Sequence, residues 1–384
     1  MIYLDNAATT PVVPAALEAA WPYLTSEFGN SSSTHELGLR AKQALENARA
    51  TCGAWLDVPA SDIIFTSGGT EGDNLAITGL ALAYPRGKHI ISALTEHEAV
   101  LETLRFLERV HGFEITWLEI DGQGNIDLAE LTAALRPHTT LVTLMLANNE
   151  IGTLHPLPEI IDAAHAVGAL VHTDAVQAAG WCDLRVGASG AVVRGVDALT
   201  ISGHKLGAPK GSGLTYIRGR LAVEPVLHGG GQEFGRRSGT ENVAWAVALS
   251  TALQQLPEPT AEATRVSTLR DDFIAQVLGT IPQASLTGNP TQRHPGIASF
   301  TCAGLNGETL LLELEQRGVI VSSGSACAAG SDEPSHVLVA CGIDPDTART
   351  SIRFSFSHNT TAEELNMAAE AFVSAVSAVS GLAQ

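Results

Sequence analysis

The chain has 384 residues, of which 45% are hydrophobic, and a formal net charge of −19 at pH 7. This length is large for one compact unit, so we expect two domains. The negative charge argues against direct nucleic-acid binding, which depends on Lys and Arg, and the lack of an apolar run of ~18 residues argues against a membrane span.

The first residues, Met1–Asn6, lack the basic region followed by an apolar region that marks a secretory signal, so we expect a cytoplasmic protein.

From about residue 60 to 220, short apolar runs alternate with helical stretches. The runs are 63–66, 89–94, 141–146, 169–173 and 198–201. Such runs are typical of strands that helices bury on both faces, so the sequence predicts an α/β fold with a mainly parallel sheet.

Polar residues or glycines follow each of these runs, directly or within a few residues. They are Ser67–Thr70, His97, Asn148–Glu150, Asp174 and Ser202–Lys205. Ligands of parallel sheets bind at the carboxyl ends of the strands. We therefore expect these segments to meet at one binding site.

The glycine-containing segment Ser67–Asn74 lies between a predicted strand and a predicted helix. Backbone N–H groups and a hydroxyl at the start of a helix can hold a phosphate group. The segment lacks the lysine of a Walker motif and the spacing of a dinucleotide fingerprint, which argues against nucleoside triphosphates and dinucleotides. An ordinary glycine turn is the alternative interpretation.

Three side chains in these segments suit the chemistry of pyridoxal phosphate (PLP). Lys205 stands at a strand end, where a rigidly held amine can form a Schiff base with an aldehyde. Asp174 can pair with a protonated pyridine nitrogen, and His97 can stack on a ring and move protons. Taken singly, each has a structural alternative: an exposed loop lysine, a helix N-cap and a structural histidine.

The segment Leu256–Thr260 contains two prolines between Ala-rich helical stretches and is the predicted domain boundary. The chain after it is expected to form a smaller C-terminal domain. Its last helix is predicted to begin at Thr361–Glu364, which has the pattern of a capping box.

Five cysteines lie far apart, odd in number and without a C-x-x-C pair, so neither a disulfide framework nor a zinc site is expected. Cys327 stands in the small, polar segment 321–330, which we expect to be a mobile loop with a reactive thiol. The other cysteines stand in or beside apolar or mixed segments, where buried thiols are expected. They are Cys52, Cys182, Cys302 and Cys341.

Several segments, in matching order over nearly the whole chain, resemble motifs of the cysteine desulfurases. They are Tyr3–Thr10, Asn30–His35, Thr66–Glu71, Ala147–Gly152, Ser202–Lys205, Arg237–Thr240 and Ser323–Cys327. The chain is similar to the NifS/IscS branch of the class-V aminotransferase family. The resemblance implies a homodimeric, fold-type I PLP-dependent transferase. It implies a large, mainly parallel-sheet PLP domain of residues 12–256 and a small α+β domain of residues 1–11 and 257–384.

The resemblance also assigns roles to residues of this chain. The implied catalytic residues are Lys205, which carries PLP, Cys327, which receives sulfur, and His97, which stacks on the ring and serves as an acid–base group. The implied cofactor-binding residues are Gly69, Thr70, Asn148, Asp174, Gln177, Ser202, His204 and Lys205, with Thr240 reaching from the partner subunit. Gln177 and Asn148 are implied to approach the ring oxygen of PLP. Arg353 of the small domain is implied to bind the substrate carboxylate, and Asn148 is implied to contact the substrate as well. No metal is expected.

The implied reaction converts L-cysteine to L-alanine and leaves a persulfide on Cys327. A protein sulfur acceptor or scaffold then takes the sulfur for iron–sulfur cluster assembly, tRNA or cofactor thiolation, or DNA phosphorothioation. The absence of an extended C-terminal tail favours a DndA-type enzyme of phosphorothioation. The alternatives are another PLP enzyme of the same fold, either a selenocysteine lyase or an aminotransferase, and a non-catalytic sulfur carrier.

Overall fold

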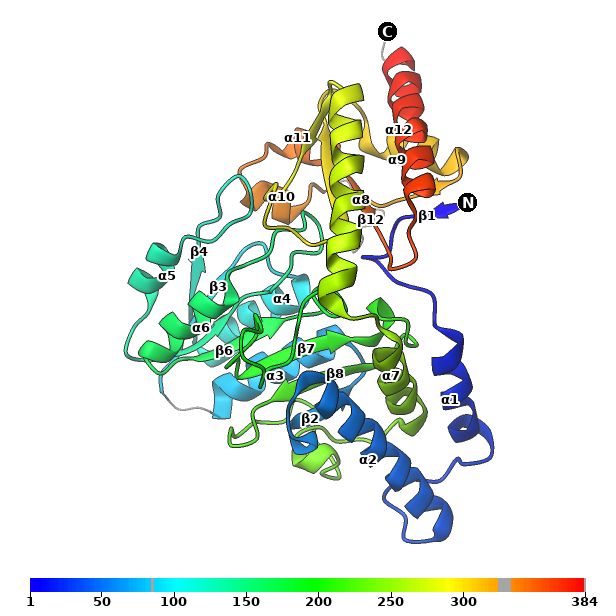
Figure 1. Ribbon diagram of the computed structural model, residues 1–384. Helices are drawn as coiled ribbons and strands as arrows, with labels where there is room; N and C mark the ends of the chain where they lie inside the picture. Colours follow the sequence, from blue (N-terminus) through cyan, green and yellow to red (C-terminus); the bar gives the residue numbers. More distant parts are fainter. Residues whose placement is uncertain (84–85, 324–332, 383–384) are drawn as a thin grey trace.

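The computed structural model describes residues 1–83, 86–323 and 333–382, so Cys327 lies outside the described residues. Figure 1 shows a larger body built around a sheet and a smaller body whose long helices, α8 and α12, extend away from it. In the described ranges, no helix is both long and apolar enough to cross a membrane.

The larger body contains a seven-stranded sheet. In sheet order its strands are β2 (Ile63–Thr66), β8 (Gly213–Ile217), β7 (Ala198–Ser202), β6 (Leu170–Asp174), β5 (Thr139–Thr143), β3 (His89–Ala93) and β4 (Glu114–Leu118). Neighbouring strands are parallel except where β8 pairs with β2 and β7. The predicted α/β fold with a mainly parallel sheet is confirmed.

Helices connect and cover these strands (Figure 1). The α-helices of the larger body are α1 (Pro14–Thr25), α2 (Glu36–Leu56), α3 (Gly69–Ala83), α4 (Glu98–Phe106), α5 (Leu128–Ala134), α6 (Leu157–Ala166) and α7 (Val243–Gln255). Its short turns of other helix types are η1 (Ala60–Asp62), η2 (Leu107–His111), η3 (Gly203–Lys205) and η4 (Glu233–Gly235).

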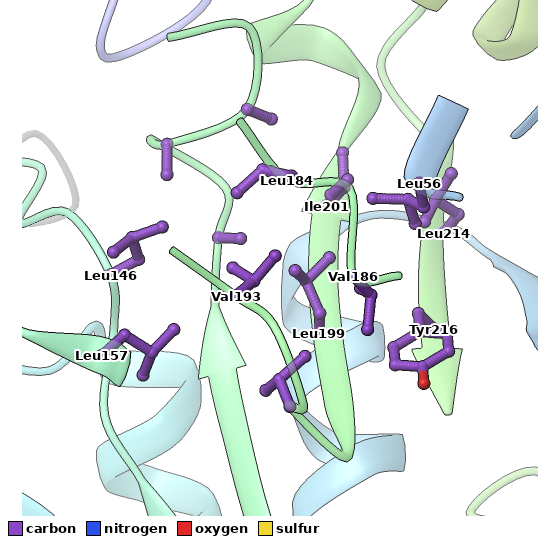
Figure 2. Close-up of a cluster of buried hydrophobic side chains, with 14 of the residues drawn as sticks. Leu56, Leu146, Leu157, Leu184, Val186, Val193, Leu199, Ile201, Leu214 and Tyr216 are labelled. Atoms are coloured by element: carbon purple, nitrogen blue, oxygen red, sulfur yellow. The ribbon is translucent and has the colours of Figure 1, made fainter. Parts of the chain in front are cut away.

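Both faces of the sheet are apolar, because consecutive strand residues point to opposite faces and each face packs on helices. Ile90 and Ile91 are both fully buried. Ile90 packs in a cluster with α3 and α4, whereas Ile91 packs in a second cluster with α1, α6 and α7. Figure 2 shows part of this second cluster, where Leu199 and Ile201 of β7 lie near Val193. Burial on both faces explains why the strands appear in the sequence as unbroken apolar runs.

The smaller body combines the first residues with the C-terminal part of the chain. Its elements are β1 (Ile2–Tyr3), α8 (Pro259–Thr280), β9 (Ala284–Leu286), β10 (Ile297–Cys302), α9 (Gly307–Gln316), β11 (Val319–Ile320), α10 (His336–Ala340), α11 (Pro345–Ala348), β12 (Ile352–Ser355) and α12 (Ala362–Leu382). β10 pairs antiparallel with β9 and β12, and β1 pairs parallel with β11. Ile2 and Leu4 share a core with Phe273, Phe300 and Phe354. This separate core supports the predicted domain division, which stays a prediction.

A buried ion pair ties α2 to the loop after β8. The guanidinium of Arg49 donates to both carboxylate oxygens of Glu233, at 2.6 and 2.9 Å, and both side chains are 2% exposed. The rings of Phe65 and Phe234 lie 4.9 and 5.1 Å from the guanidinium carbon. Glu233 and Phe234 adopt left-handed backbone angles, with φ of 47° and 59°, which are unfavourable for non-glycine residues. The ion pair therefore stabilises the loop after β8 in a conformation whose left-handed backbone angles at Glu233 and Phe234 are unfavourable on their own.

Replacement of Glu233 with alanine is expected to lower the free energy of unfolding by about 3–5 kcal/mol, because Arg49 is left as a buried charge without its partner. Urea unfolding measures the loss. Glu46→Ala is the matched control, since Glu46 is a 43% exposed carboxylate 3.4 Å from the same guanidinium, and its removal is expected to cost less than about 1 kcal/mol. Equal losses in the two variants would contradict the dominant role of Glu233.

Candidate active site

A cavity of about 480 Å³ lies at the carboxyl ends of β5, β6 and β7, a size that is ordinary for a small-molecule site. The structure brings most of the predicted site residues to its wall. These residues are Gly69, Thr70, His97, Asp174, Gln177, Ser202, His204, Lys205 and Arg353. The smaller body contributes Ala7, Ala8, Glu333, Pro334 and His336 to the same wall. The cavity is therefore formed by both bodies.

Lys205 ends the 3₁₀ turn η3 that directly follows β7. Its Nζ donates hydrogen bonds to the carbonyl oxygens of Ala7 and Ala8, the latter at 2.7 Å. The turn packs closely, because a Cβ added at Gly203 would lie 2.3 Å from Oγ of Ser212. The end of a buried strand and a tight turn thus place the amine in the cavity, next to the N-terminal segment.

Asp174 is the last residue of β6, and its side chain is buried. Its Oδ1 accepts the backbone N–H of Val176 at 2.8 Å. Burial raises the pKa of Asp174, whereas His97 and Lys205 nearby act in the opposite direction. Burial and the neighbouring Asp174 also raise the pKa of Asp73 well above its usual value. A cation placed against this pair of carboxyl groups would stabilise the ionised form of Asp174.

The segment predicted to hold a phosphate lies at the start of α3, which begins at Gly69. Gly68 has a φ of 151°, which residues with a side chain rarely adopt, and a Cβ added at Gly69 would lie 3.0 Å from Cγ2 of Val176. Backbone N–H groups of a helix start can therefore approach an anion closely here. Ser202 and His204 line the cavity beside this segment, and burial together with Lys205 and Lys210 lowers the pKa of His204 to about 4. His204 is thus neutral at pH 7 and can act as a hydrogen-bond partner.

Arg353 lies on β12 and is 1% exposed, yet it lines the cavity. Its Nη1 donates to the carbonyl oxygen of Asn149 at 2.8 Å, and its Nη2 lies 3.0 Å from Oδ1 of Asp5. Asn149 belongs to the larger body and Asp5 to the N-terminal segment, so the two contacts fix the direction of the guanidinium. A fixed planar cation in a cavity is suited to binding a carboxylate.

Among the described residues, the predicted site residues Asn148 and Thr240 are not part of this wall. Asn148 is 1% exposed, its Nδ2 donates to the carbonyl oxygen of Thr95, and its Oδ1 accepts the N–H groups of Glu150 and Ile151. Thr240 is exposed in the loop after β8, and Cys327 lies outside the described residues. The predicted contacts of Asn148 and Thr240 with the cofactor stay predictions.

The sequence interpretation missed several wall residues, above all His336, Ala7 and Ala8. His336 is the first residue of α10, and Ser335 caps this helix by accepting the N–H of Leu338. The pattern Pro334–Ser335 before an apolar stretch was the signal for a helix start that would have pointed to it. Ala7 and Ala8 have no chemical signal of their own, because they take part through backbone carbonyls.

Residues 2–367 match the family model described as aminotransferase class-V, which is nearly the whole chain. The chain belongs to the class-V aminotransferase family. This chain is 44% identical over 367 residues to the protein named cysteine desulfurase IscS of Dictyoglomus turgidum, covering 95% of this chain and 92% of that protein. It is 42% identical over 370 residues to the protein of the same name from Methanosarcina thermophila, covering 96% and 90%.

Solved structures agree with these relatives. A NifS-like protein superposes on this chain with a TM-score of 0.88 and 32% identity, covering 98% of this chain and 99% of that one. DndA from Streptomyces lividans superposes with a TM-score of 0.75 and 34% identity, covering 92% and 99%. The predicted membership of the NifS/IscS branch and the fold-type I architecture are confirmed.

PLP is the cofactor of the class-V aminotransferase family, and the wall of this cavity fits it. Lys205 offers an amine for the aldehyde, Asp174 a carboxylate for the ring nitrogen, and the start of α3 a cradle for the phosphate. The fit is tightest at Asp174, because burial raises its pKa and a protonated ring nitrogen is the counter-charge that a buried carboxylate requires.

Proposed function

We propose that this member of the class-V aminotransferase family is a PLP-dependent cysteine desulfurase, which takes the sulfur of L-cysteine as a persulfide on Cys327 and releases L-alanine. The observation that carries the proposal is the shared cavity of Lys205, Asp174, His97 and Arg353. It occurs in a chain whose relatives, 44% identical over nearly its whole length, are named cysteine desulfurases.

In this proposal, Lys205 would hold PLP covalently through its amine, and Asp174 would hold the ring nitrogen. The phosphate is held by Gly69, Thr70, Ser202 and His204, all of which line one cavity. The ring oxygen is approached by Gln177 and Asn148. When bound, PLP supplies an electron sink for negative charge at the α-carbon of the substrate.

The residues of the chain perform the remaining steps. Arg353 binds the carboxylate of cysteine through two parallel hydrogen bonds, which orients the α-carbon toward Lys205. The amine of Lys205 then removes the α-proton. His97 would stack on the cofactor ring, and the thiolate of Cys327 attacks the sulfur of the substrate.

We also propose that the enzyme is a homodimer in which Thr240 of one subunit reaches the phosphate of the other. Large apolar side chains are exposed on α1 and α2 and between them, and beside the Thr240 loop, where a second copy would cover them. They are Trp21, Phe28, Leu39 and Phe234, with exposed fractions of 61%, 67%, 57% and 59%. Exposed apolar groups of this size are typical of interfaces.

The persulfide is proposed to pass to a protein acceptor or scaffold in the cytoplasm. Iron–sulfur cluster assembly is one destination, since relatives are named IscS. DNA phosphorothioation is another, because DndA is among the structural neighbours. With a net charge of −19, the enzyme is expected to deliver sulfur to a protein and not to bind nucleic acid itself.

The test is to incubate the purified enzyme with cysteine, with and without a thiol reductant, and to measure alanine, sulfide and the visible spectrum together. The proposal predicts a yellow protein, one equivalent of alanine without reductant, and continuous release of alanine and sulfide with it. An amino-group transfer to a keto acid without sulfide would support an aminotransferase instead. A colourless protein that forms no alanine would support a non-catalytic carrier.

Replacement of Arg353 with lysine is expected to raise the KM for cysteine about 10- to 100-fold and to change kcat less. A lysine cannot make two parallel hydrogen bonds to a carboxylate, and one charged hydrogen bond is worth about 1.5–3 kcal/mol. Steady-state alanine formation measures the effect. Arg349→Lys is the matched control, because Arg349 pairs with the exposed Asp346, and its KM is expected to be that of the parent. Loss of the yellow colour in the Arg353 variant would show that this residue belongs to the phosphate site.

A further inference from the structure

Three histidines line the cavity: His204 lies beside the predicted phosphate segment, and His97 and His336 hold their ring nitrogens in different ways. His97 is the N-cap of α4, and its Nδ1 accepts the backbone N–H of Ala99 at 3.1 Å. The lone pair of Nδ1 is thereby engaged, so a neutral His97 ring carries its proton on Nε2. Toward the cavity, neutral His97 can donate a hydrogen bond but has no lone pair to accept a proton.

In His336 the other ring nitrogen, Nε2, makes the structural hydrogen bond. Its Nε2 lies 3.0 Å from the carbonyl oxygen of Glu96. A carbonyl oxygen can only accept, so Nε2 is the donor and a neutral His336 ring has its lone pair on Nδ1. The structural hydrogen bond of His336 therefore leaves it a basic nitrogen, whereas the structural hydrogen bond of His97 does not.

Hydrogen bonds and short chain connections link His336 to both His97 and Arg353. Its partner Glu96 directly precedes His97 in the chain. On the other side, Ser335 donates a hydrogen bond to Glu150, and the residue before Glu150 is Asn149, whose carbonyl oxygen accepts from Arg353. A cysteine whose carboxylate is bound by Arg353 and whose amino group is at Lys205 would extend its thiol into this part of the cavity.

We propose that His336 is a further catalytic residue, whose Nδ1 accepts the thiol proton of the substrate cysteine. This inference rests on the proposed function. The thiolate of Cys327 supplies the electron pair of the new S–S bond, and the S–Cβ bond of the substrate breaks with its pair moving to Cβ. The S–H proton moves to Nδ1 of His336, which leaves the terminal sulfur as a persulfide anion. The same proton then passes from Nδ1 to Cβ and completes the methyl group of alanine, so that atoms and charge balance.

The discriminating variant is His336→Gln, because a glutamine amide can keep the hydrogen bond to the carbonyl of Glu96 but offers no basic nitrogen at the position of Nδ1. Alanine formation in a single turnover without reductant is expected to fall about 100-fold, the usual contribution of one acid–base group. The half-saturating cysteine concentration and the visible spectrum of the cofactor are expected to stay as in the parent. His138→Gln, at an exposed histidine, is the control and is expected to have the parent rate.

Chemical rescue separates proton transfer from a structural role. In His336→Ala, added imidazole is expected to restore alanine formation at least about 10-fold, because a free base can occupy the space of the lost ring. Failure of imidazole to raise the rate would contradict a proton-accepting role for His336.

A second readout requires no turnover. In protein labelled with ¹⁵N-histidine, the signal that disappears in His336→Gln is expected to show a protonated Nε2 and an unprotonated Nδ1. A proton on Nδ1, or a His336→Gln rate within twofold of the parent, would overturn the inference while leaving the proposed function intact. A parent enzyme that forms no alanine from cysteine would overturn the proposed function, and this inference with it.

Discussion

Replacement of Lys205 with alanine is expected to reduce alanine formation by at least about 1,000-fold. The change removes both the covalent attachment of the cofactor and the base that takes the α-proton, and one acid–base group alone contributes about 10²- to 10⁴-fold. The fold is expected to survive, because the substitution removes polar contacts at the cavity wall, among them the hydrogen bonds to Ala7 and Ala8, and no part of the core clusters. Thermal unfolding checks this.

The site of attachment can be measured directly. Borohydride reduction of the parent enzyme is expected to fix the colour to the protein, and peptide mass spectrometry is expected to find the reduced cofactor on Lys205. Lys210→Ala is the matched control, since Lys210 is exposed five residues further along the chain; it is expected to keep colour and activity. Reduced cofactor on Lys210 would refute the assignment.

Replacement of Cys327 with serine is expected to abolish alanine formation from cysteine, while the protein stays yellow. The thiol acts only after the substrate has bound, so the spectral change on adding cysteine is expected to remain. A hydroxyl is a poor nucleophile toward sulfur at neutral pH. Near-normal alanine formation by this variant would refute the desulfurase mechanism and favour a lyase or an aminotransferase.

The other cysteines supply the controls for this experiment. Cys52, Cys302 and Cys341 are buried and Cys182 is half-buried, close to the sequence expectation of buried thiols. Burial raises the pKa of each of these four thiols to about 12. At neutral pH they carry almost no thiolate, which is the reactive form. Cys182→Ser, the least buried of the four, is therefore expected to keep the parent rate.

The sheet and much of the site could be predicted from sequence because both depend on local patterns. Strands that are buried on both faces appear in the sequence as apolar runs. Because ligands of parallel sheets bind at the carboxyl ends of the strands, the ends of these runs then predicted that Asp174, Ser202 and Lys205 lie together at one edge of the sheet. Strand limits were less accurate. The predicted strand 141–146 corresponds to β5, which spans Thr139–Thr143. The chain stays buried after it leaves the sheet, so the apolar run in the sequence extends beyond the last residue that pairs with a neighbouring strand.

What the sequence interpretation missed depends on contacts between distant segments or on backbone groups. Ala7 and Ala8 accept hydrogen bonds from Lys205, almost 200 residues away, through carbonyl oxygens that every residue has. His97 was predicted as a ring-stacking, acid–base residue; its N-cap bond to Ala99, which decides which nitrogen carries the proton, has no sequence signal beyond its place before a helix. His336 reaches the cavity through α10 of the smaller body, a segment that lies far along the chain from the strand ends where ligands were expected.

The most direct test of the central claim is to mix the enzyme with one equivalent of cysteine, without reductant, and to weigh its cysteine-containing peptides by mass spectrometry. The account predicts that the peptide of Cys327 gains the mass of one sulfur atom while an equal amount of alanine appears, and that the peptides of Cys52, Cys182, Cys302 and Cys341 are unchanged. Alanine and free sulfide in equal amounts, with the Cys327 peptide unmodified throughout, would contradict it.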